Sequence, residues 1–283
     1  MIQTAEALAS ARRRLTSVPQ ANPELEARLL LAEVLDKPPT HLLAWPEKAL
    51  TDAQAERYER LLRRRLGGEP IAYITGEREF WSLPLEVTPD TLIPRPETEQ
   101  LVELALQHIP PRAKWRIADL GTGSGAIAAA IASERPGCRV VATDLSAAAL
   151  AVAKRNFERL GLTHITTVQG SWFEALHDAP PFDLILTNPP YISRHDPHLR
   201  QGDLPSEPAL ALVAGGDGLD AIRIIARQAP CHLAKDGRLM LEHGFDQGSA
   251  ARRLLVEAGF SETSTHRDLA GNERITTGLC PSR

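Results

Sequence analysis

The chain has 283 residues, of which 43% are hydrophobic and 24% charged, and this composition is typical of an ordinary globular protein. The formal net charge of −4 argues against a generally basic nucleic-acid-binding protein, so a nucleic-acid partner would need a local basic patch. Cys138, Cys231 and Cys280 lack CxxC spacing and no other metal-ligand spacing occurs, so we expect neither a disulfide framework nor a metal site. Without a signal core or a membrane-length apolar run, the sequence predicts a cytoplasmic protein with no membrane partner.

Helical patterns occupy residues 1–70. Asn22 stands before a proline and marks a helix start, and Thr51 with Gln54 forms a capping-box pattern. Gly67–Gly68 is a natural helix stop. We therefore expect a small all-helical domain over residues 1–70.

The arginine triplets at 12–14 and 63–65 have two possible interpretations. They could form a basic face for a partner, but nearby glutamates favour ordinary solvated helix surfaces.

Residues 71–96 differ in composition from the helical segment and contain short apolar and aromatic runs broken by Gly76. We expect this segment to be a linker that contains short strands in a β-hairpin.

Apolar strand-like runs alternate with helical stretches over residues 97–283. This alternation predicts an α/β fold, a Rossmann-like domain with a parallel sheet covered by helices. The polar stretch at 193–207 is long for a connection inside a compact domain and is a candidate substrate-contacting loop. The apolar runs lie at 116–120, 139–143, 183–187 and 237–241.

A glycine-rich turn follows the first of these runs. Gly121, Gly123 and Gly125 permit a tight turn and let a ligand approach the backbone N–H groups at a helix start. Their GxGxG spacing differs from the GxGxxG dinucleotide fingerprint, so a pyrophosphate site is not the first inference. Asp144 ends the next run, where it could accept hydrogen bonds from ribose hydroxyls or cap the following helix. The loop and the acid together predict a cofactor that contains adenosine.

The motif Asn188-Pro189-Pro190-Tyr191 ends the run at 183–187. Two prolines remove two donors and fix two φ angles, so a central strand must end there. The Asn188 side-chain oxygen and the Pro189 carbonyl are two restricted acceptors, and Tyr191 offers a flat face. They match a planar NH2 group and favour the positive charge that develops when its nitrogen attacks. A simple strand-ending turn remains the alternative for this motif alone.

These motifs resemble those of class I methyltransferases that use S-adenosylmethionine and methylate planar NH2 groups. The chain from about residue 68 to its end further resembles the family of bacterial peptide-chain release factor glutamine N5-methyltransferases. Several ordered stretches carry this resemblance: GEPIAYITGEREFWSLPLEV, LIPRPETEQLVE, IADLGTGSGAIAAAIA, TNPPYI, GGDGLD, LEHGFDQG and DLAGNERI.

The resemblance implies that S-adenosylmethionine donates the methyl group and that S-adenosylhomocysteine is the product. It implies that the substrate is the glutamine in the Gly-Gly-Gln loop of class 1 release factors, with residues 1–70 helping to dock the factor and residues 97–283 forming the methyltransferase domain. The catalytic residues that it implies are Asn188, Pro189, Pro190 and Tyr191. The cofactor-binding residues that it implies are Gly121, Thr122, Gly123, Ser124, Gly125, Asp144, Trp172 and Asn188.

Five further residues stand in or beside these motifs. Ser171 occupies a position where relatives often carry aspartate, and we leave it out of the expected site. Asp119 could orient the amino-acid part of the cofactor or simply anchor the glycine loop. Arg95 and Glu97 could touch the cofactor, but we favour a structural role. His243 invites a role as a general base, which an activated methyl donor does not require, so we expect a structural histidine.

Three other functions remain open at this level. An enzyme that methylates glutamine in a ribosomal protein would bind the same amide, and an adenine-N6 methyltransferase of nucleic acid would bind a similar NH2 group after flipping the base. The acidic total and the lack of a large basic insertion count against direct nucleic-acid binding. A module that binds without turnover is the third alternative, and the intact Asn188 argues against it.

Overall fold

A computed structural model of the chain describes residues 2–280. Contacts between residues divide the chain into two compact units, which we call the helical unit and the sheet unit. The helical unit comprises Met1–Glu77 with Pro197–Ser206, and the sheet unit comprises Arg78–Asp196 with Glu207–Arg283. This division differs from the predicted domains, because residues 197–206, far along the chain, pack with the N-terminal helices.

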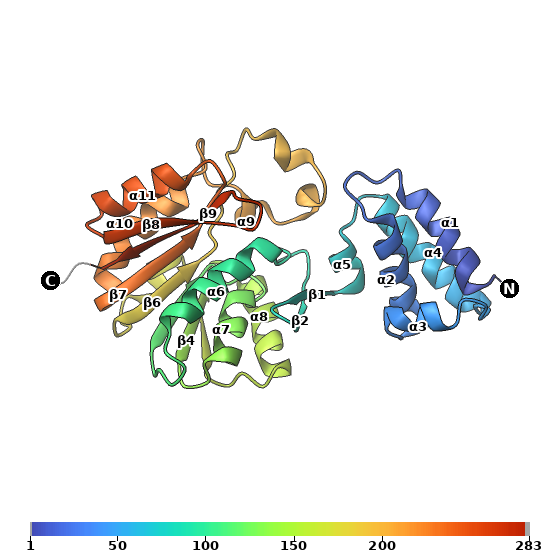
Figure 1. Cartoon of the computed structure of the whole chain (residues 1–283), viewed down its shortest axis with the longest axis horizontal. Coiled ribbons are helices and arrows are strands. Elements are labelled where there is room, and N and C mark those ends of the chain that lie inside the picture. Colours follow the sequence, from blue (N-terminus) through green and yellow to red (C-terminus); the bar gives the residue numbers. More distant parts are fainter. Residues whose placement is uncertain (1, 281–283) are drawn as a thin grey trace. The chain divides into compact units, whose positions relative to one another are not determined.

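The helical unit contains α1 (Thr4–Leu15), α2 (Pro23–Leu35), α3 (Pro39–Ala44), α4 (Asp52–Leu66) and α5 (Ile71–Thr75), shown in Figure 1. The predicted helix signals are confirmed: Asn22 accepts the N–H of Leu25, and Thr51 and Gln54 form a reciprocal capping box. Helix α4 ends at Leu66, directly before the predicted glycine stop. Leucines from α1, α2 and α4 pack into one apolar core.

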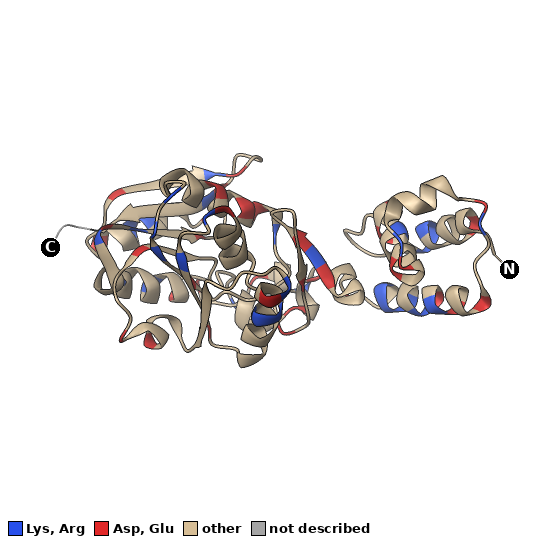
Figure 2. Ribbon diagram, turned by 90° about the horizontal axis from the view of Figure 1, so that it is seen from below, with Lys and Arg blue, Asp and Glu red and all other residues tan. Residues whose placement is uncertain are grey.

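Many charged side chains of the helical unit are paired with one another. Figure 2 shows basic and acidic residues on the same helices. In the two arginine triplets, Arg12 pairs with Glu24, Arg14 and Arg63 share Glu59, and Arg64 pairs with Glu69. The preferred reading of these triplets, as solvated and neutralised helix surfaces, is therefore confirmed for most of their members.

Arg65 differs from its neighbours because it is buried, with 4% of its surface exposed. Its guanidinium donates to both carboxylate oxygens of Glu26, at 2.8 and 3.2 Å, and to Asp203 at 3.0 Å. Asp203 lies between the 3-10 turns η3 (Pro197–Arg200) and η4 (Leu204–Ser206). This ion-pair network explains why residues 197–206 belong to the helical unit.

A two-stranded sheet of β1 (Glu77–Phe80) and β2 (Leu83–Glu86) follows α5, as the predicted hairpin requires. The sheet unit is then built on a seven-stranded sheet in the order β5-β4-β3-β6-β7-β9-β8. The strands from β5 to β7 are parallel, and β9 runs antiparallel to β7 and β8. Their bounds are β3 (Arg116–Leu120), β4 (Arg139–Asp144), β5 (Ile165–Gln169), β6 (Phe182–Thr187), β7 (Leu233–Glu242), β8 (Ser261–Arg267) and β9 (Glu273–Leu279).

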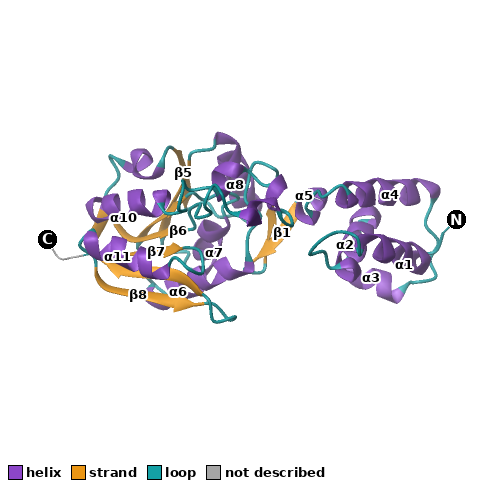
Figure 3. Cartoon of the chain, turned by 90° about the horizontal axis from the view of Figure 1, so that it is seen from above, coloured by secondary structure: helices purple, strands orange, loops and turns teal. Residues whose placement is uncertain are grey.

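Helices cover both faces of this sheet (Figures 1 and 3), because alternate residues along each central strand are apolar on both sides. In β6, Leu184 and Leu186 pack in one core with α6 (Glu99–His108), α7 (Ala126–Glu134) and α8 (Ala147–Arg159). Ile185 packs in the opposite core with α10 (Asp220–His232) and α11 (Gly248–Glu257). The Rossmann-like α/β fold is thus confirmed. No helix between residues 2 and 280 is long and apolar enough to cross a membrane.

Candidate functional site

Three neighbouring strands end side by side at the point where the strand order reverses. Leu120 of β3 is in register with Thr143 of β4 and with Thr187 of β6. The next residues along the chain are Gly121, Asp144 and Asn188. The parallel sheet therefore brings the predicted glycine loop, acid and NPPY motif together at one edge, where ligands bind in open α/β sheets.

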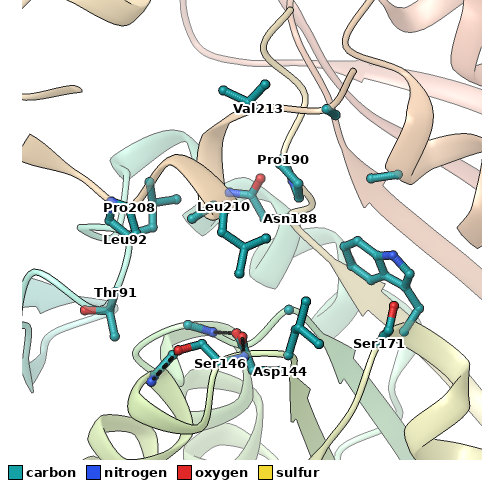
Figure 4. A pocket seen from close by; sticks show the side chains of 18 of the residues that line it. Thr91, Leu92, Asp144, Ser146, Ser171, Asn188, Pro190, Pro208, Leu210 and Val213 are labelled. Atoms are coloured by element: carbon teal, nitrogen blue, oxygen red, sulfur yellow. Dashed lines mark hydrogen bonds between the residues drawn. The ribbon is translucent and has the colours of Figure 1, made fainter. Parts of the chain in front are cut away.

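A pocket of ≈ 410 Å³ opens at this edge, within the size range of small-molecule sites, roughly 300–1,000 Å³. Figure 4 shows Asp144 and Ser146 on one side of it and Asn188 and Pro190 on the other. Of the predicted site residues, the pocket is lined by Gly121, Gly123, Asp144, Trp172, Asn188 and Pro190. Further lining comes from residues 89–92, 145–146, 149, 170–171, 208, 210–211, 213–215, 220–221 and 224.

The predicted cofactor residues of the glycine loop divide into lining and supporting positions. Gly121 and Gly123 reach the pocket with φ values of 70° and 55°, which a residue with a side chain rarely adopts. Gly125 faces away from it: a Cβ there would lie 2.5 Å from Phe157, so α8 packs directly against the start of α7. Thr122 and Ser124 are likewise buried within the loop. These three residues determine the shape of the loop.

Asp144 joins the glycine loop to the next helix. Its two carboxylate oxygens accept the backbone N–H groups of Gly123 at 2.9 Å and Ser146 at 2.8 Å. Ser146, and not Asp144, is the N-cap of α8, because its hydroxyl accepts the N–H of Ala149. Burial raises the pKa of Asp144. Asp144 lines the pocket, so its carboxylate can accept hydroxyl donors there with the lone pairs that the backbone N–H groups leave free.

Trp172 opens the 3-10 turn η2 (Trp172–Leu176) with a positive φ of 48°. A Cβ on Gly121 would lie 3.5 Å from its indole ring, so the ring and the glycine loop are close neighbours. Ser171 precedes it and also lines the pocket, although we left it out of the expected site. The exposed apolar side chains of Leu145, Leu210 and Ile224 extend this apolar wall.

Asn188 lines the pocket and is held by a hydrogen bond from its side-chain nitrogen. Its amide nitrogen donates to the Thr98 hydroxyl at 3.0 Å, and that hydroxyl donates to Glu242 at 2.7 Å. No donor among residues 2–280 bonds to the Asn188 side-chain oxygen. That oxygen is thus available as an acceptor at the pocket.

Tyr191 and Glu242 lie behind the NPPY turn. The Tyr191 hydroxyl donates to the second carboxylate oxygen of Glu242 at 3.3 Å, and the Gln247 side chain donates to the Tyr191 carbonyl at 3.0 Å. Burial raises the pKa of Glu242 to about 7 and also raises the pKa of Tyr191. Tyr191 and Pro189 are not among the pocket-lining residues of the described chain.

Asp119 anchors the glycine loop, one of its two expected roles. It accepts the Thr122 hydroxyl at 2.6 Å and the Ala128 N–H at 3.2 Å. Its other oxygen is buried and has no hydrogen-bond partner among residues 2–280, and burial raises the pKa of Asp119 to about 7. A buried carboxylate with a spare acceptor is suited to a cationic ligand nearby.

The expected structural roles of Arg95 and His243 fit their contacts. Arg95 pairs with the buried Glu207, which also accepts the N–H of Ile93. His243 is fully buried, and its ring bonds to Thr276 at 2.9 Å and to the Gly244 carbonyl at 2.8 Å, while burial lowers its pKa. In the part of the chain that the structure describes, no cluster of three or more His, Cys, Asp or Glu residues is arranged to bind a metal.

Two buried residues of this site were missed from the sequence: Thr98 and Glu242. Each stands in a quoted motif, LIPRPETEQLVE and LEHGFDQG, but threonine and glutamate have ordinary alternative roles in such positions. A signal for Glu242 exists, since it is a charged residue directly after the apolar run at 237–241. Its neighbour Leu241 is in register with Thr187, which places Glu242 beside Asn188.

Two family models match the chain. A PrmC N-terminal domain model matches residues 6–76, and a methyltransferase small domain model matches residues 98–204.

Curated relatives match over nearly the whole length. The chain is 49% identical to the release factor glutamine methyltransferase of Aliivibrio fischeri over 257 residues, which is 91% of this chain and 90% of that protein. It is 52% identical to the release factor glutamine methyltransferase of Pseudomonas aeruginosa over 254 residues, 90% of this chain and 91% of that protein.

A solved structure shares the fold. The 16S rRNA N2 G1207 methyltransferase of T. thermophilus, in complex with AdoMet and guanosine, matches with a TM-score of 0.56 at 19% identity, over 72% of this chain and 50% of that one. At this identity the likeness supports the fold alone.

Proposed function

Because the chain belongs to the release factor glutamine methyltransferase family, we propose that it transfers a methyl group from S-adenosylmethionine to the side-chain amide nitrogen of the glutamine in the Gly-Gly-Gln loop of class 1 release factors. The observation that carries this proposal is the orientation of Asn188. Its NH2 group is already bonded to Thr98, so its oxygen is left to accept an N–H from an incoming amide.

The pocket residues fit the methyl donor. Asp144 has lone pairs for ribose hydroxyls, Gly121 and Gly123 leave the backbone uncovered, and Trp172 offers an aromatic face beside them. Asp119 adds a buried acceptor with no partner among the described residues, which suits the cationic amino-acid part of the donor. When bound, S-adenosylmethionine supplies a methyl group activated by its sulfonium centre, and S-adenosylhomocysteine is the product.

The protein's own contribution is to orient a weak nucleophile. An amide nitrogen is a poor nucleophile because its lone pair is delocalised into the carbonyl. The Asn188 oxygen and the Pro189 carbonyl would accept its two hydrogens, align the nitrogen and stabilise the positive charge that develops on it. Pro190 keeps Pro189 extended, and Tyr191 would pack against the amide plane.

We assign substrate docking to the helical unit and place the reaction in the cytoplasm with the translation machinery. The family match over residues 6–76 supports the first assignment. Many charges of this unit are already paired, so docking would depend on shape and apolar contacts, such as those available at the exposed Leu43 and Trp45, as well as on charge.

The decisive experiment supplies labelled S-adenosylmethionine with a release factor, a ribosomal protein and DNA in parallel reactions. We expect label on the release factor alone, and none when its loop glutamine is replaced by alanine. Label on the ribosomal protein or on adenine in DNA would instead support the two alternative methyl acceptors, and absence of label on all three would contradict the proposal.

A further inference from the structure

A chain of hydrogen bonds leads from the pocket into the interior of the sheet unit. Asn188 donates to Thr98 at 3.0 Å, Thr98 donates to Glu242 at 2.7 Å, and Tyr191 donates to the other oxygen of Glu242 at 3.3 Å. Thr98 comes from the 3-10 turn η1 (Pro96–Thr98), Asn188 and Tyr191 follow β6, and Glu242 ends β7. The Glu242 carboxylate thus contacts Tyr191 directly and Asn188 through Thr98.

The direction of this chain is determined by donor counting. An ionised carboxylate only accepts hydrogen bonds, so the single hydroxyl hydrogen of Thr98 points at Glu242. Thr98 then has only lone pairs to offer to Asn188. The asparagine must therefore present its NH2 group to Thr98 and its oxygen to the pocket.

This orientation matters because the two ends of a carboxamide have almost the same shape. Packing alone does not distinguish them, whereas hydrogen-bond partners do. If Asn188 were rotated by half a turn about its last side-chain bond, an NH2 group would face the NH2 group of the substrate. The acceptor that binds the substrate amide would be lost, and two donors would be opposed.

The burial of Glu242 argues against a role in stability alone. It is 1% exposed, and no arginine or lysine between residues 2 and 280 forms an ion pair with it. Arg274 lies near but is paired with Asp268. A buried carboxylate without an ion-pair partner costs free energy, whereas a buried apolar side chain at this position would not. The position therefore carries a group that weakens the fold, beside the proposed active site.

We propose that Glu242 and Thr98 are positioning residues for methyl transfer: the Glu242 carboxylate, acting through the Thr98 hydroxyl, holds the Asn188 oxygen toward the substrate amide and holds the Tyr191 ring by its hydroxyl. The inference rests on the proposed function of the site. It extends that function by naming the residues that select a glutamine side chain over a glutamate side chain in the substrate. A reversed Asn188 would present its NH2 group and would accommodate a carboxylate, which only accepts hydrogen bonds.

The test compares Thr98→Val, which keeps the shape and removes the hydroxyl, with Thr98→Ser, which restores it. Two quantities are measured with the full-length protein: kcat for methylation of an intact release factor, and binding of release factors carrying either glutamine or glutamate in the loop. We expect T98V to lower kcat by about 100-fold, the usual scale for losing one oriented group. We also expect its preference for glutamine over glutamate to fall by at least about tenfold, and T98S to stay within about threefold of the wild type.

Thr277→Val is the matched control. Thr277 is 4% exposed and its hydroxyl bonds to Ser264 at 2.9 Å, outside the pocket, so T277V also removes a buried hydroxyl from the sheet unit. It should leave kcat and substrate preference unchanged. Thermal unfolding and S-adenosylmethionine affinity verify that each variant is folded, and Thr98→Ala replaces T98V if the valine is not tolerated.

The outcomes separate the two proposals. A wild-type protein that does not methylate the release factor would overturn the proposed function. An active wild type with an equally active T98V, or with a T98S as impaired as T98V, would overturn the positioning role. A T98V that loses kcat but keeps its full preference for glutamine would assign Thr98 a merely structural role, and would also overturn it.

Discussion

Both compact units bury carboxylates, but they treat them in opposite ways. In the helical unit, Glu26 is matched by the fork of Arg65 at 2.8 and 3.2 Å. In the sheet unit, Asp119 and Glu242 are just as buried, but within the described part of the chain they receive only hydroxyl and backbone N–H donors. The Glu26–Arg65 ion pair joins distant segments of the chain. The two acids Asp119 and Glu242 lie beside a pocket, and burial raises the pKa of both to about 7.

This difference in pairing indicates which buried carboxylates stabilise the fold and which belong to a functional site. A paired buried charge is costly to break but need not be functional. A buried acid without a cation, next to a cleft, is a typical mark of a functional site. The helical unit should therefore respond to mutation mainly in stability, and the sheet unit mainly in methyl transfer.

The largest effect is expected in the helical unit. Arg65→Met leaves Glu26 buried without its partner and should lower the free energy of unfolding by about 3–5 kcal/mol. Denaturant unfolding followed by circular dichroism measures this loss. The double variant R65M/E26L removes both charges and should recover most of it, so equal damage in the single and double variants would contradict the role assigned to the pair.

Asn188→Ala should abolish most methyl transfer. It removes the acceptor at the pocket, and we expect kcat to fall by about 10²–10³-fold, which corresponds to about 3–4 kcal/mol. Binding of S-adenosylmethionine should stay close to that of the wild type, as measured by calorimetry. Asn272→Ala, in an exposed turn, is the control and should behave as the wild type. Unchanged turnover in N188A would refute the proposed mechanism.

Asp144→Ala should act on the methyl donor instead. Losing an acceptor for ribose hydroxyls is expected to weaken S-adenosylmethionine binding by about 10–100-fold, the cost of one or two hydrogen bonds to a charged group. A titration with the donor measures this change. Asp178→Ala, at a solvent-exposed position, should leave the affinity as it is. Equal affinities of D144A and the wild type would remove Asp144 from the donor site.

The smallest effect is a pH dependence of turnover. The groups around the Glu242 carboxylate are Thr98, Tyr191, Arg274 and Glu97, and burial is the main cause that raises its pKa to about 7. Below that value the acid is protonated and can donate to Thr98, which frees Asn188 to reverse. Turnover should therefore rise with pH up to about 7 and then level off, with about a tenfold loss one pH unit below.

Glu242→Gln provides the control for this pH dependence. The amide does not ionise, so the step in the pH profile near 7 should disappear. Turnover should be lower, because an amide can either donate to Thr98 or accept from it and so does not determine the direction of the Thr98 hydroxyl. Stability should change in the opposite sense. Because burial raises the pKa of Glu242 from 4.5 to about 7, the wild-type fold loses stability as pH rises from about 4.5 to about 7 and regains none of it above. E242Q should therefore be the more stable protein at pH 8, by on the order of 1 kcal/mol. A step of unchanged size in E242Q would exclude Glu242 as its source and would assign it to Asp119, whose pKa burial also raises to about 7.

The sequence predicted the central strands well and the outer strands poorly. The apolar runs at 116–120, 139–143, 183–187 and 237–241 all lie within β3, β4, β6 and β7. These strands are buried on both faces, so their composition reveals them. Strands β5, β8 and β9 were not predicted, because β5 and β8 are polar edge strands and β9 has neither a continuous apolar run nor a regular alternation.

The candidate site shows the same limit. Gly121, Asp144 and Asn188 could be found because glycine spacing, a strand-end acid and paired prolines have specific local consequences. The roles of Thr98 and Glu242 could not be predicted, even though Glu242 directly follows an apolar run, because these roles depend on partners 90 and 144 residues away along the chain. The packing of residues 197–206 with the N-terminal helices depends in the same way on Arg65 and Asp203, 138 residues apart.

By itself the sequence determined which residues could do chemistry, since an amide and a proline carbonyl restricted by adjacent prolines are acceptors in any fold. It also determined that strands would carry these residues to one edge of a parallel sheet. Only the tertiary structure decided which end of the Asn188 amide faces the pocket. That choice depends on a donor-to-acceptor sequence through Thr98 to Glu242, which exists only once three separate segments are packed together.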